Sequence, residues 1–311
     1  MTSALSVAPP VTVRVPAKVN LELGVGPRRD DGYHALSTVF MAVGLHDEVT
    51  ASPCAEWQVD VSGPYAAKVP TDDTNLALRA ARALAAEVGV DDPVALHIRK
   101  EIPVAGGMAG GSADAAAALL ACDQLWSSGM SRDELSTLAA GIGSDVPFCL
   151  SGGIAIGSGR GEQLAPVLAT GSYHWVFAVS DVGLSTPEVY AECDRLRGSA
   201  AVPEPEPSSD MMTALRCGDP EALGRALTND LQEAAFSLQP SLREVVDAGL
   251  EYGALGGIVS GSGPTIAFLT GSPELALDLC VSLAASGVAG EVRRAKAPVQ
   301  GAHVVAGPGR V

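Results

Sequence analysis

The chain has 311 residues, a formal net charge of −16, and 47% hydrophobic but only 4% aromatic residues. Its length exceeds the size at which one hydrophobic core usually stops growing, so we expect two domains packed mainly with Ala, Val and Leu. The negative charge argues against nucleic acid and anionic membranes as partners, because both attract basic surfaces.

Residues 1–15 hold no apolar run long enough for a signal peptide, and no later segment reaches the ~20 apolar residues of a membrane span. We therefore expect a cytoplasmic protein that acts as a monomer or a homodimer. The six cysteines are scattered, without a Cys-x-x-Cys pair or a neighbouring histidine at zinc spacing. We expect them to be reduced, and we expect no metal site built from side chains alone.

The first part of the chain alternates apolar and polar residues as strands do. A charged turn is expected at 27–32, and residues 75–88 have a helical spacing that ends at Gly89. The last predicted strand of this part leads directly into a glycine-rich loop. The predicted strands cover residues 11–15, 21–24, 35–43, 45–52, 56–62 and 94–100.

The glycine-rich loop, residues 103–113, contains Gly106, Gly107, Gly110 and Gly111 and runs into an alanine-rich helix. Glycine lets main-chain N–H groups approach a ligand closely, and a helix N-terminus adds unpaired donors and partial positive charge. The loop therefore predicts a phosphate site, with a tight strand-to-helix turn as the structural alternative. It lacks the lysine of a P-loop, and its spacing and position disfavour a dinucleotide-binding loop.

The second half alternates strands with helices. A capping box at Ser131–Glu134 begins a helix that we expect to reach Ala140. Beyond it the order of elements predicts a ferredoxin-like α+β unit. A further strand is predicted over 153–157; the strands of the ferredoxin-like unit are predicted over 174–180, both ends of 256–269 and 290–296, and its helices over 219–233, 240–252 and 273–285.

We place the domain boundary at residue 170, which gives an N-terminal domain over 1–170 and a C-terminal domain over 171–311. One segment of the second domain, 198–210, differs from its surroundings. Its central stretch, Pro203–Pro207, is too polar and too rich in proline to pack. We therefore expect a flexible excursion there rather than a helix or a strand.

Three segments carry a family resemblance: Pro16–Leu21, the glycine-rich loop and Gly261–Thr265. In their order and residue sequence they are similar to segments of the GHMP kinase family, which are small-molecule kinases whose glycine loop differs from the P-loop. The resemblance implies a two-domain α+β GHMP-kinase fold, with the phosphate loop in an N-terminal mixed β/α domain and a ferredoxin-like C-terminal domain. The chain most closely resembles members whose acceptor carries a cytidine diphosphate group, at Pro16–Leu21, Asp31–His34, Gly143–Phe148 and Thr186-Pro187.

The resemblance implies ATP as the phosphate donor. Ser112 is expected to turn its hydroxyl toward phosphate or Mg²⁺, and Asp114 to assist through a water molecule. Because the sequence has no evident carboxylate cluster for a metal, Mg²⁺ is expected to arrive with ATP. Ala105 and Ala109 replace glycines usual in the family, and their methyl groups are expected to tighten the loop. The residues implied to bind ATP are Pro103, Val104, Ala105, Gly106, Gly107, Met108, Ala109, Gly110, Gly111, Ser112 and Ala113.

Phosphorylation of an alcohol needs a group that orients the hydroxyl and takes its proton. The predicted base is Asp145, in a loop between glycines and a proline, with a capping role before Pro147 as the alternative. Lys18 lies in a largely apolar strand, where burial without a partner would be costly. We therefore predict an ion pair between Lys18 and Asp145, with a lysine extending from an edge strand to solvent as the alternative.

The resemblance also implies the acceptor site. Tyr33 and His34 are expected to hold the cytosine by stacking and hydrogen bonds, and Tyr190 to cover its other face, whereas without the resemblance the two tyrosines are ordinary packing rings. Asn20 and Thr186 are further expected substrate contacts. The rival hypotheses are another family member acting on homoserine, mevalonate or a sugar, a non-catalytic nucleotide-binding protein, and a dehydrogenase.

Overall fold

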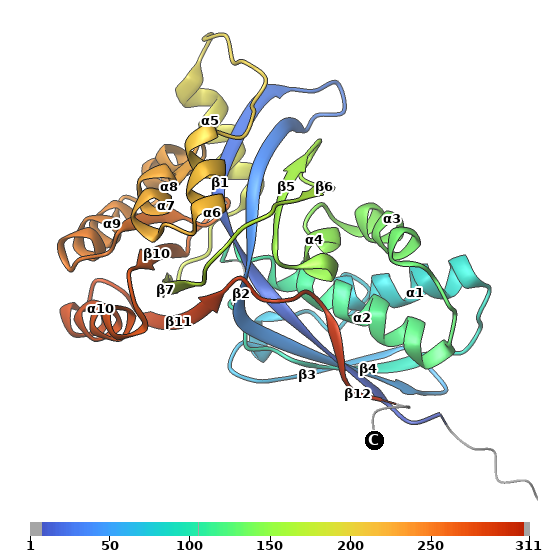
Figure 1. The fold of residues 1–311 in the computed structure, drawn as a ribbon. Helices are drawn as coiled ribbons and strands as arrows, with labels where there is room; N and C mark the ends of the chain where they lie inside the picture. Colours follow the sequence, from blue (N-terminus) through green and yellow to red (C-terminus); the bar gives the residue numbers. More distant parts are fainter. Residues whose placement is uncertain (1–7, 105, 308–311) are drawn as a thin grey trace, which may run out of the picture.

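The protein is described by a computed structural model over residues 8–104 and 106–307. Figure 1 shows a long β-hairpin, β1–β2, that connects a sheet covered by α1–α3 with a second, helix-covered sheet. The first sheet has the strand order β12-β1-β2-β4-β3, with β5 on β2, β6 on β5 and β8 on β1. Its strands are β1 (Val11–Arg28), β2 (His34–Pro53), β3 (Gln58–Ser62), β4 (Val94–Arg99), β5 (Ile154–Ser158), β6 (Gln163–Pro166), β8 (Thr228–Asn229) and β12 (His303–Ala306).

The β1–β2 hairpin replaces the four shorter strands expected over residues 11–52. Its register shifts between Pro16 and Ala17 and again after Asn20. Such bulges bend a long strand without ending it, and they interrupt the alternation on which the prediction of separate strands depended. The alternation is also hidden because every residue from 15 to 23 is buried.

The helices of the first sheet agree well with their sequence signals. Helix α1 (Leu76–Val88) is capped by the Asn75 side chain and ends at Gly89 in the left-handed conformation, as predicted. The capping box between Ser131 and Glu134 is present at the start of α3 (Arg132–Ile142), which runs past the predicted end. Helix α2 (Gly110–Trp126) packs its alanines on β1, β2 and α1, and α4 (Val146–Ser151) and a 3₁₀ turn (Ala66–Lys68) complete this part.

The second sheet confirms the ferredoxin-like prediction. Its strand order is β11-β7-β10-β9, all antiparallel, which is the order of a βαββαβ unit. Its strands are β7 (Tyr173–Val179), β9 (Gly256–Val259), β10 (Ile266–Thr270) and β11 (Glu291–Ala297), and its helices are α5 (Thr186–Arg197), α6 (Ser209–Cys217), α7 (Pro220–Ala226), α8 (Gln232–Leu238), α9 (Ser241–Glu251) and α10 (Pro273–Ser286).

Two expectations for the second half were wrong. The helix expected over 219–233 is divided into α7 and α8, because Leu227 is extended and Thr228 and Asn229 pair with β1. The 198–210 segment has no helix or strand before Ser209, as predicted, but it does pack. A Cβ built on Gly24 of β1 would lie 2.8 Å from Cβ of Pro205, so the proline ring covers a strand that has no side chain there.

Hydrogen bonds also fix the end of this segment. The N–H and hydroxyl groups of Ser208 donate to the carboxylate of Glu22, each at 2.9 Å. Burial raises the pKa of Glu22, and these two hydrogen bonds partly oppose the shift. The excursion is therefore attached to β1 at Glu22 and Gly24, close to the distal part of the hairpin (Figure 1).

The boundary at residue 170 falls between β6 and β7, and it stays a prediction. The second half contributes two strands to the first sheet, since β8 and β12 lie after the boundary and pair with β1. Within the described parts of the chain, none of the helices combines the length and apolar character needed to cross a membrane.

Candidate active site

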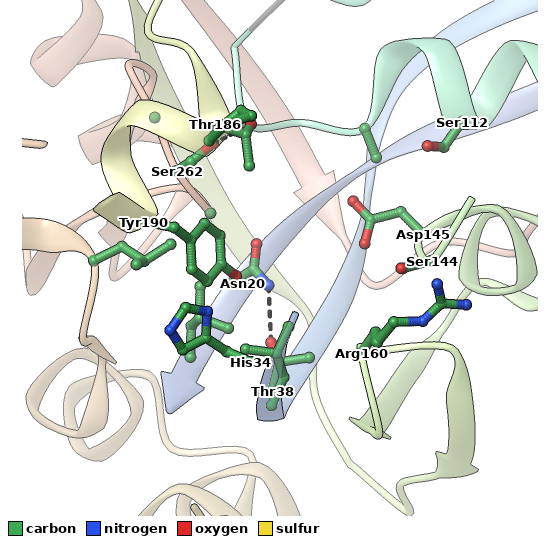
Figure 2. A pocket seen from close by; sticks show the side chains of 18 of the residues that line it. Asn20, His34, Thr38, Ser112, Ser144, Asp145, Arg160, Thr186, Tyr190 and Ser262 are labelled. Carbon is green, nitrogen blue, oxygen red and sulfur yellow. Dashed lines mark hydrogen bonds between the residues drawn. The ribbon is translucent and has the colours of Figure 1, made fainter. Parts of the chain in front are cut away.

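A cleft of about 870 Å³ opens where the hairpin, the start of α2, the β5–β6 turn and α5 meet. Figure 2 shows its side chains pointing toward a common space, with His34 and Tyr190 at one end and Asp145 and Ser112 at the other. The residues predicted from sequence that line it are Lys18, Asn20, Tyr33, His34, Gly106, Gly107, Ala109, Gly110, Gly111, Ser112, Asp145, Thr186 and Tyr190.

Part of the predicted loop lies elsewhere. Met108 and Ala113 are buried in the core, and Pro103 and Val104 do not line the cleft either. Ala105 lies outside the described residues. The backbone O of Met108 accepts the N–H of Lys18 at 3.2 Å, so this residue fastens the loop to β1. The cleft wall is thus formed by the glycines, Ala109 and Ser112.

The start of α2 presents free donors to the cleft. The first helical hydrogen bond runs from Ala113 N to Ala109 O at 2.8 Å. The N–H groups of Gly110, Gly111 and Ser112 therefore have no partner within the helix. Ala109 enters the helix with a φ of 60°, a conformation that normally favours glycine. This arrangement is suited to an anion that carries several oxygens.

The glycine-rich loop lies directly against the Gly261–Thr265 loop. Gly107 has a φ of +72°, and a Cβ built on it would lie 1.9 Å from the carbonyl oxygen of Ser260. The Ser260 hydroxyl donates to Gly107 O at 3.1 Å. A side chain at this position would separate the two loops, so Gly107 is required both by conformation and by space.

Lys18 and Asp145 form the predicted ion pair. Lys18 is only 4% exposed and its Nζ lies 3.6 Å from Asp145 Oδ2. The same Nζ donates to Asn20 Oδ1 at 2.6 Å, and Asn20 Nδ2 donates to Thr38 Oγ1 at 2.8 Å. Asp145 is the N-cap residue of α4, yet its side chain makes no capping hydrogen bond. Its carboxylate is thus free to face the cleft, as Figure 2 shows.

Behind the loop, Lys100 joins two buried carboxylates. Its Nζ donates to Asp47 Oδ2 and to Asp114 Oδ2, each at 2.6 Å. The other oxygen of Asp47 accepts the N–H groups of Glu101 and Ile102 at 2.6 and 2.8 Å. This cluster therefore links β2, the end of β4 and α2 next to the glycine-rich loop.

The members of this cluster shift one another's pKa. Burial raises the pKa of Asp114 and the charge of Asp47 adds to the shift, although Lys100 opposes it. Burial lowers the pKa of Lys100, but the charges of Asp114 and Asp47 outweigh it and the pKa is raised. Asp114 is buried and does not line the cleft, so the expectation that it assists phosphate or Mg²⁺ binding was wrong.

The opposite end of the cleft holds a histidine ring and a tyrosine ring. The rings of His34 and Tyr190 stack with centroids 5.3 Å apart, and His34 Nε2 lies 3.0 Å from Asp194 Oδ1. Tyr33 is exposed, and the guanidinium of Arg160 lies 5.2 Å from its ring centroid. Burial raises the pKa of Tyr190, so its phenol stays neutral. Thr186 Oγ1 and Ser262 Oγ are 2.8 Å apart on the wall above (Figure 2).

Sequence reasoning missed Thr38, Arg160 and Asp194 at this site. Thr38 is a buried hydroxyl in an apolar strand, and Asp194 follows Tyr190 by four residues on α5, which places both on one helix face. Arg160 is flanked by two glycines in the left-handed region, Gly159 and Gly161, which is a pattern typical of a shaped turn. None of these three signals identifies a site by itself, because each residue meets its partners in the cleft only in the folded chain.

Comparisons with known proteins agree with this geometry. The family profile described as GHMP kinases N terminal domain matches residues 75–153, and the profile described as GHMP kinases C terminal matches residues 211–288. The chain is 57% identical over 295 residues to the 4-diphosphocytidyl-2-C-methyl-D-erythritol kinase of Streptomyces avermitilis, covering 95% of this chain and 99% of that protein.

Solved structures have the same fold. A crystal structure of 4-(cytidine 5'-diphospho)-2C-methyl-D-erythritol kinase superposes with a TM-score of 0.73 at 33% identity, covering 91% of this chain and 98% of the other. A homoserine kinase from Cytophaga hutchinsonii has a TM-score of 0.74 at 20% identity, covering 98% of this chain and 99% of the other. At this identity the similarity shows the fold alone. The chain therefore belongs to the GHMP kinase family, and within it to the group of 4-diphosphocytidyl-2-C-methyl-D-erythritol kinases.

Proposed function

We propose that this protein transfers the γ-phosphate of ATP to the 2-hydroxyl of 4-diphosphocytidyl-2-C-methyl-D-erythritol, a step in the non-mevalonate (MEP) route to isoprenoid precursors. The observation that supports this most is the cleft itself. It joins the ring pair of His34 and Tyr190 to an ion-paired carboxylate, Asp145, and to the N–H groups at the start of α2 that have no partner within the helix. An acceptor with a base at one end and an alcohol at the other fits that arrangement.

In this proposal Asp145 orients the acceptor hydroxyl and takes its proton as the oxygen attacks phosphorus. Lys18 is held between Asn20 and Asp145, so its ammonium group is fixed where negative charge develops in the transition state. Asn20 in turn is oriented by Thr38. Tyr33, His34 and Tyr190 hold the cytosine, and Thr186 lies on the wall that an acceptor would contact.

The glycine-rich loop and the start of α2 fit the phosphates of ATP. A Cβ on Gly106 would lie 2.7 Å from Thr265 Oγ1 and one on Gly110 would lie 3.0 Å from Lys100 Nζ, so only glycine allows the main chain to line this space. Among the described residues no three His, Cys, Asp or Glu side chains gather as a metal site. Mg²⁺ bound to ATP would supply charge neutralisation, and Ser112, which lines the cleft at the start of α2, would offer it a hydroxyl group.

Substrate choice tests the proposed function. ADP release from Mg-ATP is measured with 4-diphosphocytidyl-2-C-methyl-D-erythritol, homoserine and mevalonate. We expect kcat/KM for the first to exceed the others by at least about 10³-fold, because a site built around buried polar contacts discriminates strongly against ligands that lack them. Comparable values for homoserine or mevalonate would assign the chain to another activity of the family.

Replacing Gly107 is expected to impair ATP binding. Gly107→Ala forces a side chain into the Ser260 carbonyl at a positive φ, and strain of this kind costs about 1–3 kcal/mol. We expect the KM for ATP to rise about tenfold or more, since about 1.4 kcal/mol corresponds to one tenfold step. Steady-state kinetics measure it. Gly141→Ala is the matched control, because a Cβ there meets nothing within 4 Å, and equal KM values for both variants would contradict the expectation.

The cytoplasmic location and the choice between monomer and homodimer stay predictions from the sequence. ATP and Mg²⁺ are likewise part of this proposal, supported by the glycine cradle and by the kinase names of the relatives.

A further inference from the structure

We propose that Arg160 binds the diphosphate of the acceptor and thereby selects a cytidine diphosphate over an uncharged nucleoside. The inference rests on the proposed function and adds to it a residue that none of the sequence motifs indicated. Arg160 lies in the turn between β5 and β6, flanked by Gly159 and Gly161, both with positive φ. The O of Gly159 accepts the N–H of Leu36 at 2.9 Å, so the turn is fixed to β2 at the cleft.

The guanidinium of Arg160 is held in position while its hydrogen-bond donors stay free. It lies 5.2 Å from the centroid of the Tyr33 ring. Its nearest carboxylate contact is with Glu162, at 3.9 Å from Nε, beyond hydrogen-bond distance. Among the described residues its side chain donates no hydrogen bond. A stacked guanidinium keeps its N–H edge free, and that edge is suited to two phosphate oxygens at once.

Location identifies the ligand group. Figure 2 shows Arg160 pointing from its turn toward Ser144 and Asp145, while its stacking partner, Tyr33, belongs to the proposed cytosine site. Arg160 thus contacts a residue of the proposed cytosine site and points toward the carboxylate end of the cleft. In the acceptor, the group between the cytidine and the methylerythritol is the diphosphate.

Charge supports the same assignment. The Lys, Arg, Asp and Glu residues among the described residues that line the cleft are Lys18, Arg28, Arg160, Asp145 and Asp194, three cations and two carboxylates, in a chain of net charge −16. Lys18 is paired with Asp145 and Asn20, and Arg28 donates to Gly32 O at 3.2 Å. Among the described residues, Arg160 is therefore the cation of the cleft whose side chain makes no hydrogen bond and keeps all its donors for an anion.

The test compares cytidine 5′-diphosphate with cytidine by calorimetry, in the presence of saturating Mg²⁺ and a non-hydrolysable ATP analogue. We expect the wild-type protein to bind the diphosphate about 10–100-fold more tightly, as charge-assisted hydrogen bonds suggest. Arg160→Gln should reduce that ratio of affinities about tenfold while changing the affinity for cytidine little. Arg160→Lys should give an intermediate ratio, because lysine keeps the charge but lacks the paired N–H donors of the guanidinium. The KM for the acceptor should rise with the KM for ATP unchanged.

Arg225→Gln is the matched control, because Arg225 is exposed on α7 and its ion-pair partner among the described residues is Glu221, at 4.0 Å. An unchanged ratio in Arg160→Gln would overturn the inference, and a raised KM for ATP would instead assign the guanidinium to the nucleotide and overturn it too. If the wild-type protein turns over the acceptor in either case, the proposed function stands. If it binds neither cytidine nor the diphosphate and shows no turnover, both fail.

Discussion

Asp145→Asn is expected to lower kcat about 10²–10⁴-fold, the range usual for loss of a general base. The amide has the size and shape of the carboxylate but does not accept the proton of the attacking hydroxyl. Lys18 keeps its hydrogen bond to Asn20 in the variant, so the cleft should retain its form. We therefore expect the KM for ATP and the affinity for cytidine 5′-diphosphate to stay within about threefold, since an interaction made mainly in the transition state lowers kcat rather than binding.

Quenched or enzyme-coupled assays of ADP formation, with both substrates saturating, measure this change in kcat. Asp133→Asn is the matched control, because Asp133 carries the same group and is exposed in the first turn of α3. A variant at position 145 that retains more than a tenth of wild-type kcat would remove the carboxylate from the proposed chemistry. A similar loss in the control would show that the assay reports folding.

Lys100→Met is expected to lower the free energy of unfolding by about 3–5 kcal/mol, the cost usual when one member of a buried ion pair is removed. Lys100 is 1% exposed and joins Asp47 and Asp114 at 2.6 Å each. Without it, two carboxylates remain buried close together. The phosphate loop should loosen as well, because the same cluster supports the start of α2.

The sign of the pH dependence identifies the cause. Burial already raises the pKa of Asp114 with Lys100 present, and removing the lysine removes the influence that opposes this shift. A carboxyl whose pKa is raised in the folded state contributes stability at low pH and loses it as the pH rises through the folded pKa. The variant should therefore lose more stability than the wild type between a weakly acidic and a weakly alkaline pH.

Urea unfolding at both pH values measures these effects. Lys68→Met is the matched control, because Lys68 is exposed and such a change usually alters stability by less than about 0.5 kcal/mol. Asp114→Asn should be milder than Lys100→Met, since it leaves Lys100 paired with Asp47. If Lys100→Met behaves like its control, or gains stability as the pH rises, the cluster does not support the fold in this way.

The sequence predicted the parts of the fold that depend on local signals. Asn75 and Gly89 bound α1, and Ser131 and Glu134 start α3, because caps are satisfied by residues three or four positions apart. The breaks expected within β1 and β2 are instead bulges inside continuous strands, whose pairing depends on a partner far along the chain. The return of Thr228 and Asn229 to β1 is equally non-local, and it divides a helix that propensity alone would continue.

The candidate site divides in the same way. Lys18 and Asp145 were paired on the argument that a buried cation needs a partner, and they lie 3.6 Å apart. Arg160 and Asp194 were missed because neither residue is unusual in its own segment. Each gains meaning only from a ring brought beside it by the fold, Tyr33 for the first and His34 for the second. Met108 shows the reverse error, a loop residue whose side chain the core needs.

Identification of the product tests the central claim most directly. The purified protein is incubated with Mg-ATP and 4-diphosphocytidyl-2-C-methyl-D-erythritol, and the mixture is followed by phosphorus NMR. We expect ADP and one phosphorylated acceptor in equal amounts, with the diphosphate resonances kept and a single new phosphomonoester on the carbon that carries the 2-hydroxyl. ADP accompanied only by inorganic phosphate, or an acceptor left unchanged while ATP persists, would contradict the proposed function.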